Sequence, residues 1–170
     1  MQQNNYWLLF VTALIPLFIG FIWYSKSLFA NTWMKEAGLT EEHLGKRKMA
    51  IVLGLTYLFS LFLSFILMNV VIHQFALYSI FANDPTMRDP NSVTGKLIAD
   101  FITKYGQNFR TFKHGAFHGI IFGLMGAMPI IAINALFERR TFKYVAIHTG
   151  YWILTLALMG GVLCGFIVAY

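Results

Sequence analysis

The charged residues of this 170-residue chain are confined to three segments, and this confinement constrains the fold more than any other feature. Residues 1–25, 49–83, 114–137 and 144–170 contain no Lys, Arg, Asp or Glu. Charged residues make up 12% of the chain and hydrophobic residues 58%, whereas soluble domains carry roughly 25% charged residues. A soluble protein of this length could not bury so much apolar surface, so we expect lipid to surround it.

Each charge-free block is long enough to cross a bilayer, because about 20 apolar residues rising about 1.5 Å each span ~30 Å of hydrocarbon. We predict membrane spans over residues 6–24, 49–73, 114–137 and 144–170. The first contains Pro16, which predicts a kink. It has no basic residue before its apolar run and no small-residue cleavage site after it, so we interpret it as a retained span. The expected fold class is all-α: one membrane domain, residues 1–170, built as a four-transmembrane-helix bundle.

The distribution of basic residues predicts an orientation. Four spans put both termini on one side, so the connections 25–48 and 138–143 share the other side and together contain eight Lys/Arg. The remaining connection, 84–113, contains five. The positive-inside rule therefore places both termini outside. The helices are apolar and no organelle address is visible, so a bacterial inner membrane is the simplest expectation.

The second connection contains a pattern typical of an amphipathic helix over residues 93–105. Ser92 can cap its first turn. Apolar residues recur at three- and four-residue spacing: Leu97, Ile98, Phe101, Ile102 and Tyr105. The other face carries Lys96, Asp100 and Lys104. We expect this helix to lie in the membrane interface, and packing against the spans is the alternative.

Small residues recur every four positions in the last two spans. The first stripe is Gly115, Gly119, Gly123 and Ala127, and the second is Ala157, Gly161, Gly165 and Ala169. Such stripes allow two helix backbones to approach closely in lipid. In an antiparallel hairpin, the residue numbers of every facing pair add up to the same total. The pairs Gly115–Ala169 and Ala127–Ala157 meet this condition, so we predict that the two stripes face each other. The alternatives are packing against another subunit or the first two spans, or the general abundance of Gly in membrane helices.

Aromatic and polar residues gather where the spans meet the inner side. The set is Trp23, Tyr24, Ser25, Trp33, Asn134, Glu138, Arg139, His148 and Tyr151. Asn134 and Glu138 are one helical turn apart. At a helix C-terminus the macrodipole disfavours a carboxylate, so Glu138 needs a partner, for which the candidates are Lys26, Arg139, Arg140 and His148. The set predicts a small polar pocket, and the alternative is an aromatic belt with snorkelling arginines and one ion pair.

Three histidines are expected at similar depth on the outer side. His114 and His118 are one turn apart, so both rings lie on one face of the third span, and His73 lies near the outer end of the second. Three imidazoles can bind zinc or copper. No Cys, Asp or Glu is obviously placed to complete the ligand set, and interfacial histidines that hydrogen-bond to carbonyls or lipid are the alternative. No other cofactor is expected.

Several short motifs stand out along the chain. They are Trp23-Tyr24-Ser25 with Leu28-Phe29 and Trp33, His114-Gly115-Ala116-Phe117-His118-Gly119, Leu136-Phe137-Glu138-Arg139-Arg140, Gly150-Tyr151 and Met159-Gly160. In combination they resemble the domain-of-unknown-function 1761 family. The similarity covers most of the chain apart from the connection 84–113. It implies a four-helix integral membrane protein and carries over no activity.

The functional expectations follow from what the spans contain. The sequence has no HExxH, GxSxG or phosphate-binding glycine loop, and the middles of the spans lack the ionisable groups that mark transport routes. We therefore predict a non-enzymatic accessory, scaffold or interaction subunit that contacts lipids, as a homo-oligomer or in a membrane complex. An oligomeric channel or carrier that uses Asn69 and Asn134 is the alternative, and a metal- or lipid-modifying enzyme is a third possibility. No Lys/Arg stripe is long enough for nucleic acid.

Overall fold

The computed structural model describes residues 4–45 and 48–168, and within these ranges the chain is helical and contains no strand. The all-α prediction is confirmed. The elements are α1 (Leu8–Thr12), α2 (Ile15–Trp23), α3 (Ala30–Ala37), α4 (Glu41–Gly45), α5 (Met49–Val71), α6 (Phe75–Ile80), α7 (Val93–Tyr105), α8 (Phe112–Phe122), the π-helical turn η1 (Gly123–Ala127), α9 (Met128–Phe137) and α10 (Phe142–Phe166).

Three helical segments are long and apolar enough to cross a membrane. They are Met49–Val71, the continuous run Phe112–Phe137 and Phe142–Phe166, with 23, 26 and 25 residues. A helix of 23 residues rises about 35 Å, more than the ~30 Å of hydrocarbon in a bilayer. The segment Leu8–Trp23 is apolar but shorter, so three of the four predicted spans meet the length criterion.

Prolines explain two irregularities in these helices. The first apolar segment is interrupted between Thr12 and Ile15, directly before Pro16, whose ring conflicts with the carbonyl of Thr12 and which has no N–H to donate. The helix is therefore interrupted at the position of the predicted kink, while Ala13 and Leu14 keep right-handed helical torsions. In the third apolar segment, the π-helical turn η1 precedes Pro129 in the same way. The π turn widens the helix without ending it.

Two other helices depart from the predicted span boundaries. The helix expected over 49–73 ends at Val71, and a turn at His73 leads into α6. The helix expected over 144–170 begins at Phe142 and ends at Phe166, where Ile167 is extended. α7 covers Val93–Tyr105, the range predicted for the amphipathic helix, and the Ser92 side chain accepts a hydrogen bond from Gly95 N.

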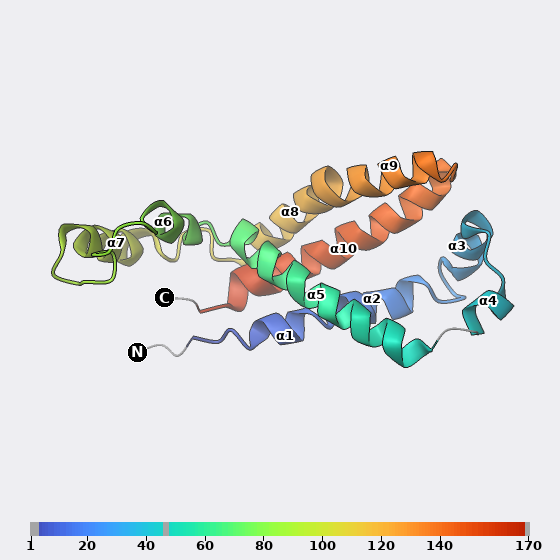
Figure 1. Cartoon of the computed structure of the whole chain (residues 1–170), viewed down its shortest axis with the longest axis horizontal. Helices are drawn as coiled ribbons and strands as arrows, with labels where there is room; N and C mark the ends of the chain where they lie inside the picture. The colour runs from blue at the N-terminus through green and yellow to red at the C-terminus, as the bar shows by residue number, and fades with distance from the viewer. Residues whose placement is uncertain (1–3, 46–47, 169–170) are drawn as a thin grey trace.

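α10 is the central element of the molecule. Figure 1 shows it between α8 and α9 on one side and α5, α1 and α2 on the other. Its buried residues Leu156, Met159 and Leu163 pack with Leu67 and Val71 of α5. α6 and α7 project at one end, and α3 and α4 lie at the other, beside the turn from α9 to α10. We call these the α7 end and the α3 end.

α8 lies directly against the backbone of α10 at its glycines. A Cβ added at Gly115 would be 2.1 Å from Gly160 O, and one at Gly119 would be 2.1 Å from Leu156 O. In the adjoining η1, a Cβ added at Gly123 would be 2.9 Å from Ile153 Cα. No side chain fits at such distances, so these contacts fix the rotation of α8.

The pairing of the two helices differs from the expected register. Gly115 faces Gly160 and Cys164 instead of position 169, and Gly119 faces Leu156 and Ala157. Gly161 and Gly165 face the ring and backbone of Phe112, at the start of α8. The observed pairs Gly115–Gly160 and Gly119–Leu156 are centred near residues 137–138 instead of residue 142. The remaining stripe residues, Ala127 and Ala157, are half-buried, and Ala169 lies outside the described residues.

Candidate functional site

An aromatic cluster occupies the α3 end of the bundle, between α2, α3 and α10. Its centre is Tyr24, whose hydroxyl lies 2.9 Å from His148 Nδ1 in a hydrogen bond. The Tyr24 ring is 5.2 Å from the Trp33 ring and 5.4 Å from the Tyr151 ring, centroid to centroid. Trp23 Nε1 donates to the carbonyl of Ile147 at 3.2 Å. Five residues of the predicted inner pocket therefore lie together: Trp23, Tyr24, Trp33, His148 and Tyr151.

The other residues predicted for the inner pocket lie around this cluster or apart from it. Ser25 is half-buried in the turn after α2, and its carbonyl accepts from the N–H groups of Leu28 and Ala30. Asn134 and Arg139 are exposed on and just after α9. The carboxylate of Glu138 is paired with Arg140, whose Nε is 3.3 Å from Glu138 Oε2.

Sequence reasoning missed the contacts that hold α3 against the turn between α9 and α10. Arg140 Nη1 donates to the carbonyl of Ala37 at 2.8 Å, and the Thr141 hydroxyl donates to Glu36 Oε2 at 2.5 Å. The turn is a Schellman motif in which Arg139 is left-handed, with φ of 55°, and Arg140 N donates to Ala135 O. A non-glycine residue in this conformation gives little sequence signal, which is why the turn was not foreseen.

A second ion pair closes the segment between α2 and α4. Lys26 Nζ lies 2.6 Å from Glu41 Oε1. This hydrogen-bonded contact raises the pKa of Lys26 and lowers the pKa of Glu41. Both groups are exposed, so water and salt screen the pair and it contributes little to stability. The α3 end therefore combines a packed aromatic cluster with ion pairs at its surface.

The α7 end contains the second candidate site, formed by three histidines from two segments. His73 Nε2 lies 3.0 Å from His114 Nε2. The ring centroids of His114 and His118 are 4.5 Å apart, and those of His73 and His118 are 4.9 Å apart. One potential ligand atom from each of the three residues lies within 4.8 Å of the other two. We call these residues the histidine triad.

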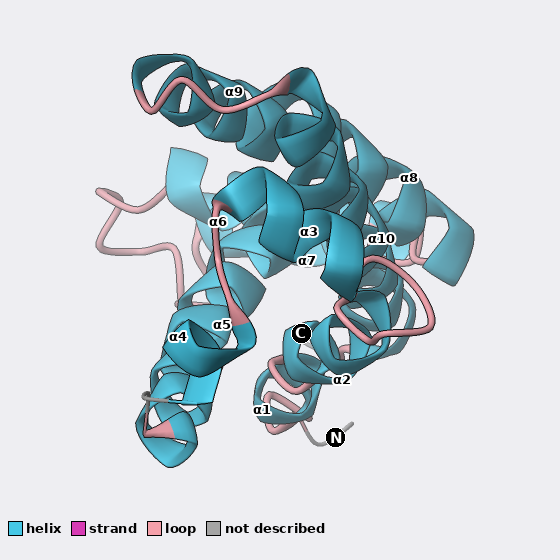
Figure 2. Cartoon of the chain, turned by 90° about the vertical axis from the view of Figure 1, so that its right-hand side faces the viewer, coloured by secondary structure: helices cyan, strands magenta, loops and turns pink. Residues whose placement is uncertain are grey.

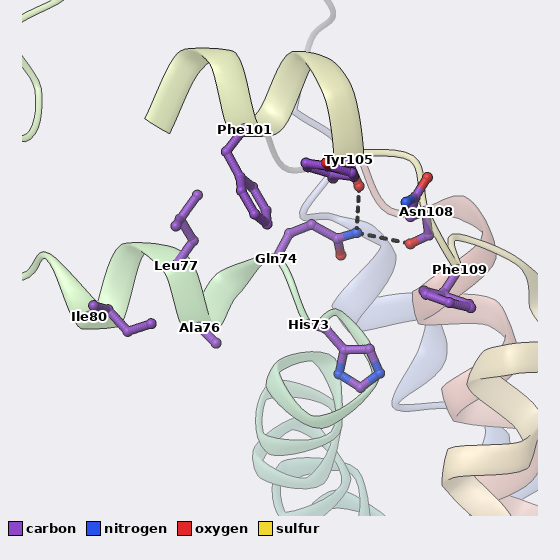
Figure 3. Close-up of a pocket in the computed structure, with 9 residues that line it drawn as sticks. All are labelled: His73, Gln74, Ala76, Leu77, Ile80, Phe101, Tyr105, Asn108 and Phe109. Carbon is purple, nitrogen blue, oxygen red and sulfur yellow. Dashed lines mark hydrogen bonds between the residues drawn. The ribbon is translucent and has the colours of Figure 1, made fainter. Parts of the chain in front are cut away.

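An apolar cavity of about 540 Å³ adjoins the triad, between α6 and α7. Its lining includes His73, Leu77, Phe101, Tyr105 and Phe109 (Figure 3). Most of the lining surface is apolar, and its polar groups come from His73, Gln74, Tyr105 and Asn108. The cavity was not predicted, because no sequence pattern in α6 or in the turn before it indicates that α6 lies beside α7.

Two features of the surrounding backbone hold the triad in place. The buried Gln74 side chain donates to the carbonyls of Tyr105 and Asn108, at 3.2 and 2.9 Å, and so ties the turn that carries His73 to the end of α7 (Figure 3). Phe109 adopts a left-handed φ of 62°, and its ring stacks on His114 with centroids 5.2 Å apart. Backbone strain of this kind occurs at both ends, at Phe109 here and at Arg139 beside α3, but only at this end does the strained residue stack on a potential metal ligand.

Comparison with known proteins supports the resemblance seen in the motifs. The family model "Protein of unknown function (DUF1761)" matches residues 7–164, nearly the whole chain. No curated protein and no solved structure matched the chain significantly. The match includes the long connection 84–113, which the motifs did not cover. The chain therefore belongs to the DUF1761 family of proteins of unknown function.

Proposed function

We propose that this chain is a four-span integral membrane protein that acts as a non-enzymatic subunit of a membrane assembly. Three long apolar helices support membrane insertion. The shorter segment of α1 and α2 packs beside α5 and α10 and exposes large apolar side chains such as Phe10, Phe18 and Phe21, as a lipid-facing helix does. Membrane lipids are then the first partners, and both termini lie outside, in a bacterial inner membrane.

The observation that carries the subunit role is the one-sided packing of α9. α8 packs against both α10 and α5, whereas α10 and the adjoining η1 are the main packing partners of α9. Figures 1 and 2 show α9 at one edge of the molecule and α5 at the opposite edge. Ile130, Ile133 and Leu136 are 63%, 54% and 76% exposed. A second copy of the chain, or another subunit, can cover this face.

Asn134 strengthens this proposal, because it is exposed beside the apolar residues of the same helix. A polar side chain on an otherwise apolar helix face offers a hydrogen-bonding group to a neighbouring helix in a membrane. An interface between subunits would pair the amide with a polar group of the neighbour. The same residue favours the second candidate function, an oligomeric channel or carrier for a small solute with Asn134 at the subunit contact.

Cysteine cross-linking in membranes tests the proposal. We expect Ile133→Cys, on α9, to give a disulfide-linked dimer or a cross-link to another membrane protein, and Phe62→Cys, equally exposed on α5, to stay uncross-linked. The native Cys164 is buried and gives a quiet background. A monomer in mild detergent, with no Ile133→Cys cross-link, would contradict the subunit role. Solute flux in liposomes that Asn134→Leu abolishes would select the channel or carrier.

A further inference from the structure

We propose that the histidine triad is a binding site for a divalent transition metal, with zinc as the reference ion. His73, His114 and His118 would each supply one imidazole nitrogen. Imidazole is a common ligand of Zn²⁺ and Cu²⁺, and three histidines with an open fourth position are one of the established ligand sets of functional zinc sites. This inference concerns the α7 end and does not depend on the subunit role proposed for α9.

The spacing of the nitrogens fits one shared ion. Two nitrogens bound tetrahedrally to zinc at about 2.0–2.1 Å lie about 3.3 Å from each other. His73 Nε2 and His114 Nε2 are 3.0 Å apart, and the potential ligand atom of His118 is within 4.8 Å of both. His118 lies one turn from His114 on the same helix face, so we expect rotation of its side chain to bring its nitrogen to the shared ion.

A hydrogen bond between histidines is the simpler explanation, but it accounts for only part of the arrangement. Such a bond needs two rings, and His73 with His114 already satisfies it. The third ring also converges, with its centroid 4.5 Å from that of His114 and 4.9 Å from that of His73. Three basic rings facing one point repel one another if they protonate, whereas a bound cation would hold them together.

The site is assembled by rigid parts of the fold, which favours metal binding over chance proximity. The backbone contacts of Gly115 and Gly119 with α10 set the rotation of α8, and therefore the direction of the neighbouring His114 and His118 side chains. Gln74 fixes the turn that holds His73, and Phe109 covers His114. A preorganised site loses less conformational entropy when the ion binds.

The adjoining cavity indicates how the fourth position can be reached. His73 belongs both to the triad and to the lining of the cavity, so the cavity lies beside one of the three proposed ligands (Figure 3) and would give water or a small donor ligand a route to the ion. In the described chain, the group of potential ligands at this place consists of the three histidines, with no carboxylate or thiolate among them. The protein therefore contributes no negative charge, and a bound Zn²⁺ would keep its full charge for an incoming anionic or water ligand.

Zinc loading of the intact protein tests the site. Protein purified in detergent, stripped with a chelator and incubated with zinc chloride should retain about one zinc per chain in elemental analysis. His114→Ala and His118→Ala should each weaken zinc binding by more than about 100-fold, beyond the 10- to 100-fold typical of losing an outer-shell partner. His148→Ala removes a histidine at the α3 end, remote from the triad, and should bind zinc as the unchanged protein does.

A second measurement uses only the unsubstituted protein, so it does not depend on whether the variants fold. X-ray absorption of the zinc-loaded, unsubstituted protein should show imidazole nitrogens at about 2.0–2.1 Å from the metal. The proposal would be overturned if the unsubstituted protein bound no zinc when incubated with micromolar zinc chloride. It would also be overturned if His118→Ala retained as much zinc as the unsubstituted protein, or if X-ray absorption showed no imidazole nitrogen bound to the metal. Loss of zinc in His148→Ala to the same extent as in His118→Ala would also overturn it, because binding would then not be specific to the triad.

Discussion

At the scale of single residues, glycine determines how closely the third and fourth apolar helices approach. The absent side chain of Gly119 leaves room for the carbonyl of Leu156, and that of Gly115 leaves room for the carbonyl of Gly160. Such close approach permits Cα–H to carbonyl contacts and dense van der Waals packing, which drive helix association in lipid. The same contacts set the direction of the histidines next to the glycines.

A Gly→Ala substitution should therefore lower the unfolding free energy at these glycines more than at a glycine without close neighbours. Gly119→Ala places a Cβ 2.1 Å from Leu156 O, a backbone atom that cannot move alone, so we expect a loss of about 1–3 kcal/mol in unfolding free energy. Gly54→Ala is the matched control: it also lies inside a helix, but nothing is within 4 Å of its added Cβ. Denaturant unfolding in detergent measures both, and equal stability of the two variants would contradict the packing argument.

At the scale of elements, α7 and the turns before it form a small unit held by side-chain caps. Ser92 accepts from Gly95 N at 2.8 Å, and Asp84 accepts from the Thr94 hydroxyl at 2.5 Å and from Thr86 N at 2.8 Å. These hydrogen bonds to the ionised carboxylate lower the pKa of Asp84. Asp84 therefore joins the chain after α6 to the first turn of α7.

The pKa of Asp84 gives this unit a definite pH dependence. A lowered carboxyl pKa means that the carboxylate form is favoured by the folded state, so its contribution is present above the ordinary value of 3.8 and is lost as pH falls through the lower folded pKa. We expect the backbone amides in the first turn of α7 to lose protection from hydrogen exchange by a few-fold as the pH falls below 3.8 and through the folded pKa of Asp84. The measured exchange rates are corrected for the intrinsic rate at each pH. Asp84→Asn should show reduced protection already at neutral pH.

An exposed carboxylate elsewhere on the helix provides the comparison. Asp100 is exposed on α7, and Asp100→Asn should leave the pH dependence of the first turn as it is in the unchanged protein. If Asp84→Asn and Asp100→Asn behave alike, the caps at Asp84 do not organise this unit.

At the scale of the whole molecule, the two ends differ in charge and in construction. The α3 end collects the connections that carry eight Lys/Arg, with Arg140 and Thr141 tying α3 to the hairpin turn. The α7 end carries the histidine triad, and the described ends of the chain meet there, where Asn5 Nδ2 donates to Phe166 O and Val168 N donates to Asn5 Oδ1. Such asymmetry suits a protein with one fixed orientation.

Accessibility of single cysteines tests that orientation. Asn91→Cys lies in the connection before α7 and Ser27→Cys lies before α3, and both positions are exposed. With the termini outside, a membrane-impermeant maleimide should label Asn91→Cys on intact cells and Ser27→Cys only after permeabilisation. The reverse pattern would show that the positive-inside argument fails here.

The sequence by itself determined the helical class, the three long apolar segments and the amphipathic α7. These features depend on composition and on periodicity along the chain, which local physics converts directly into helices. The sequence also predicted that His73, His114 and His118 lie close together. The HxxxH spacing places His114 and His118 on one helix face, and His73 lies near the end of the preceding span. The irregularities at Pro16 and before Pro129 follow a local rule as well, although the sequence did not predict that the first interrupts the helix and that the second is a π turn.

The tertiary structure alone decided how these parts meet. The register of α8 on α10 brings Gly115 to Gly160 and Gly119 to Leu156, and the position of the charged connection in the sequence does not predict these pairs. The division of the inner residues into a packed aromatic cluster and an exposed Asn134 depends on which face of each helix has a neighbour. Contacts between segments far apart in the chain are set by the packing of the whole molecule, and no local pattern encodes them.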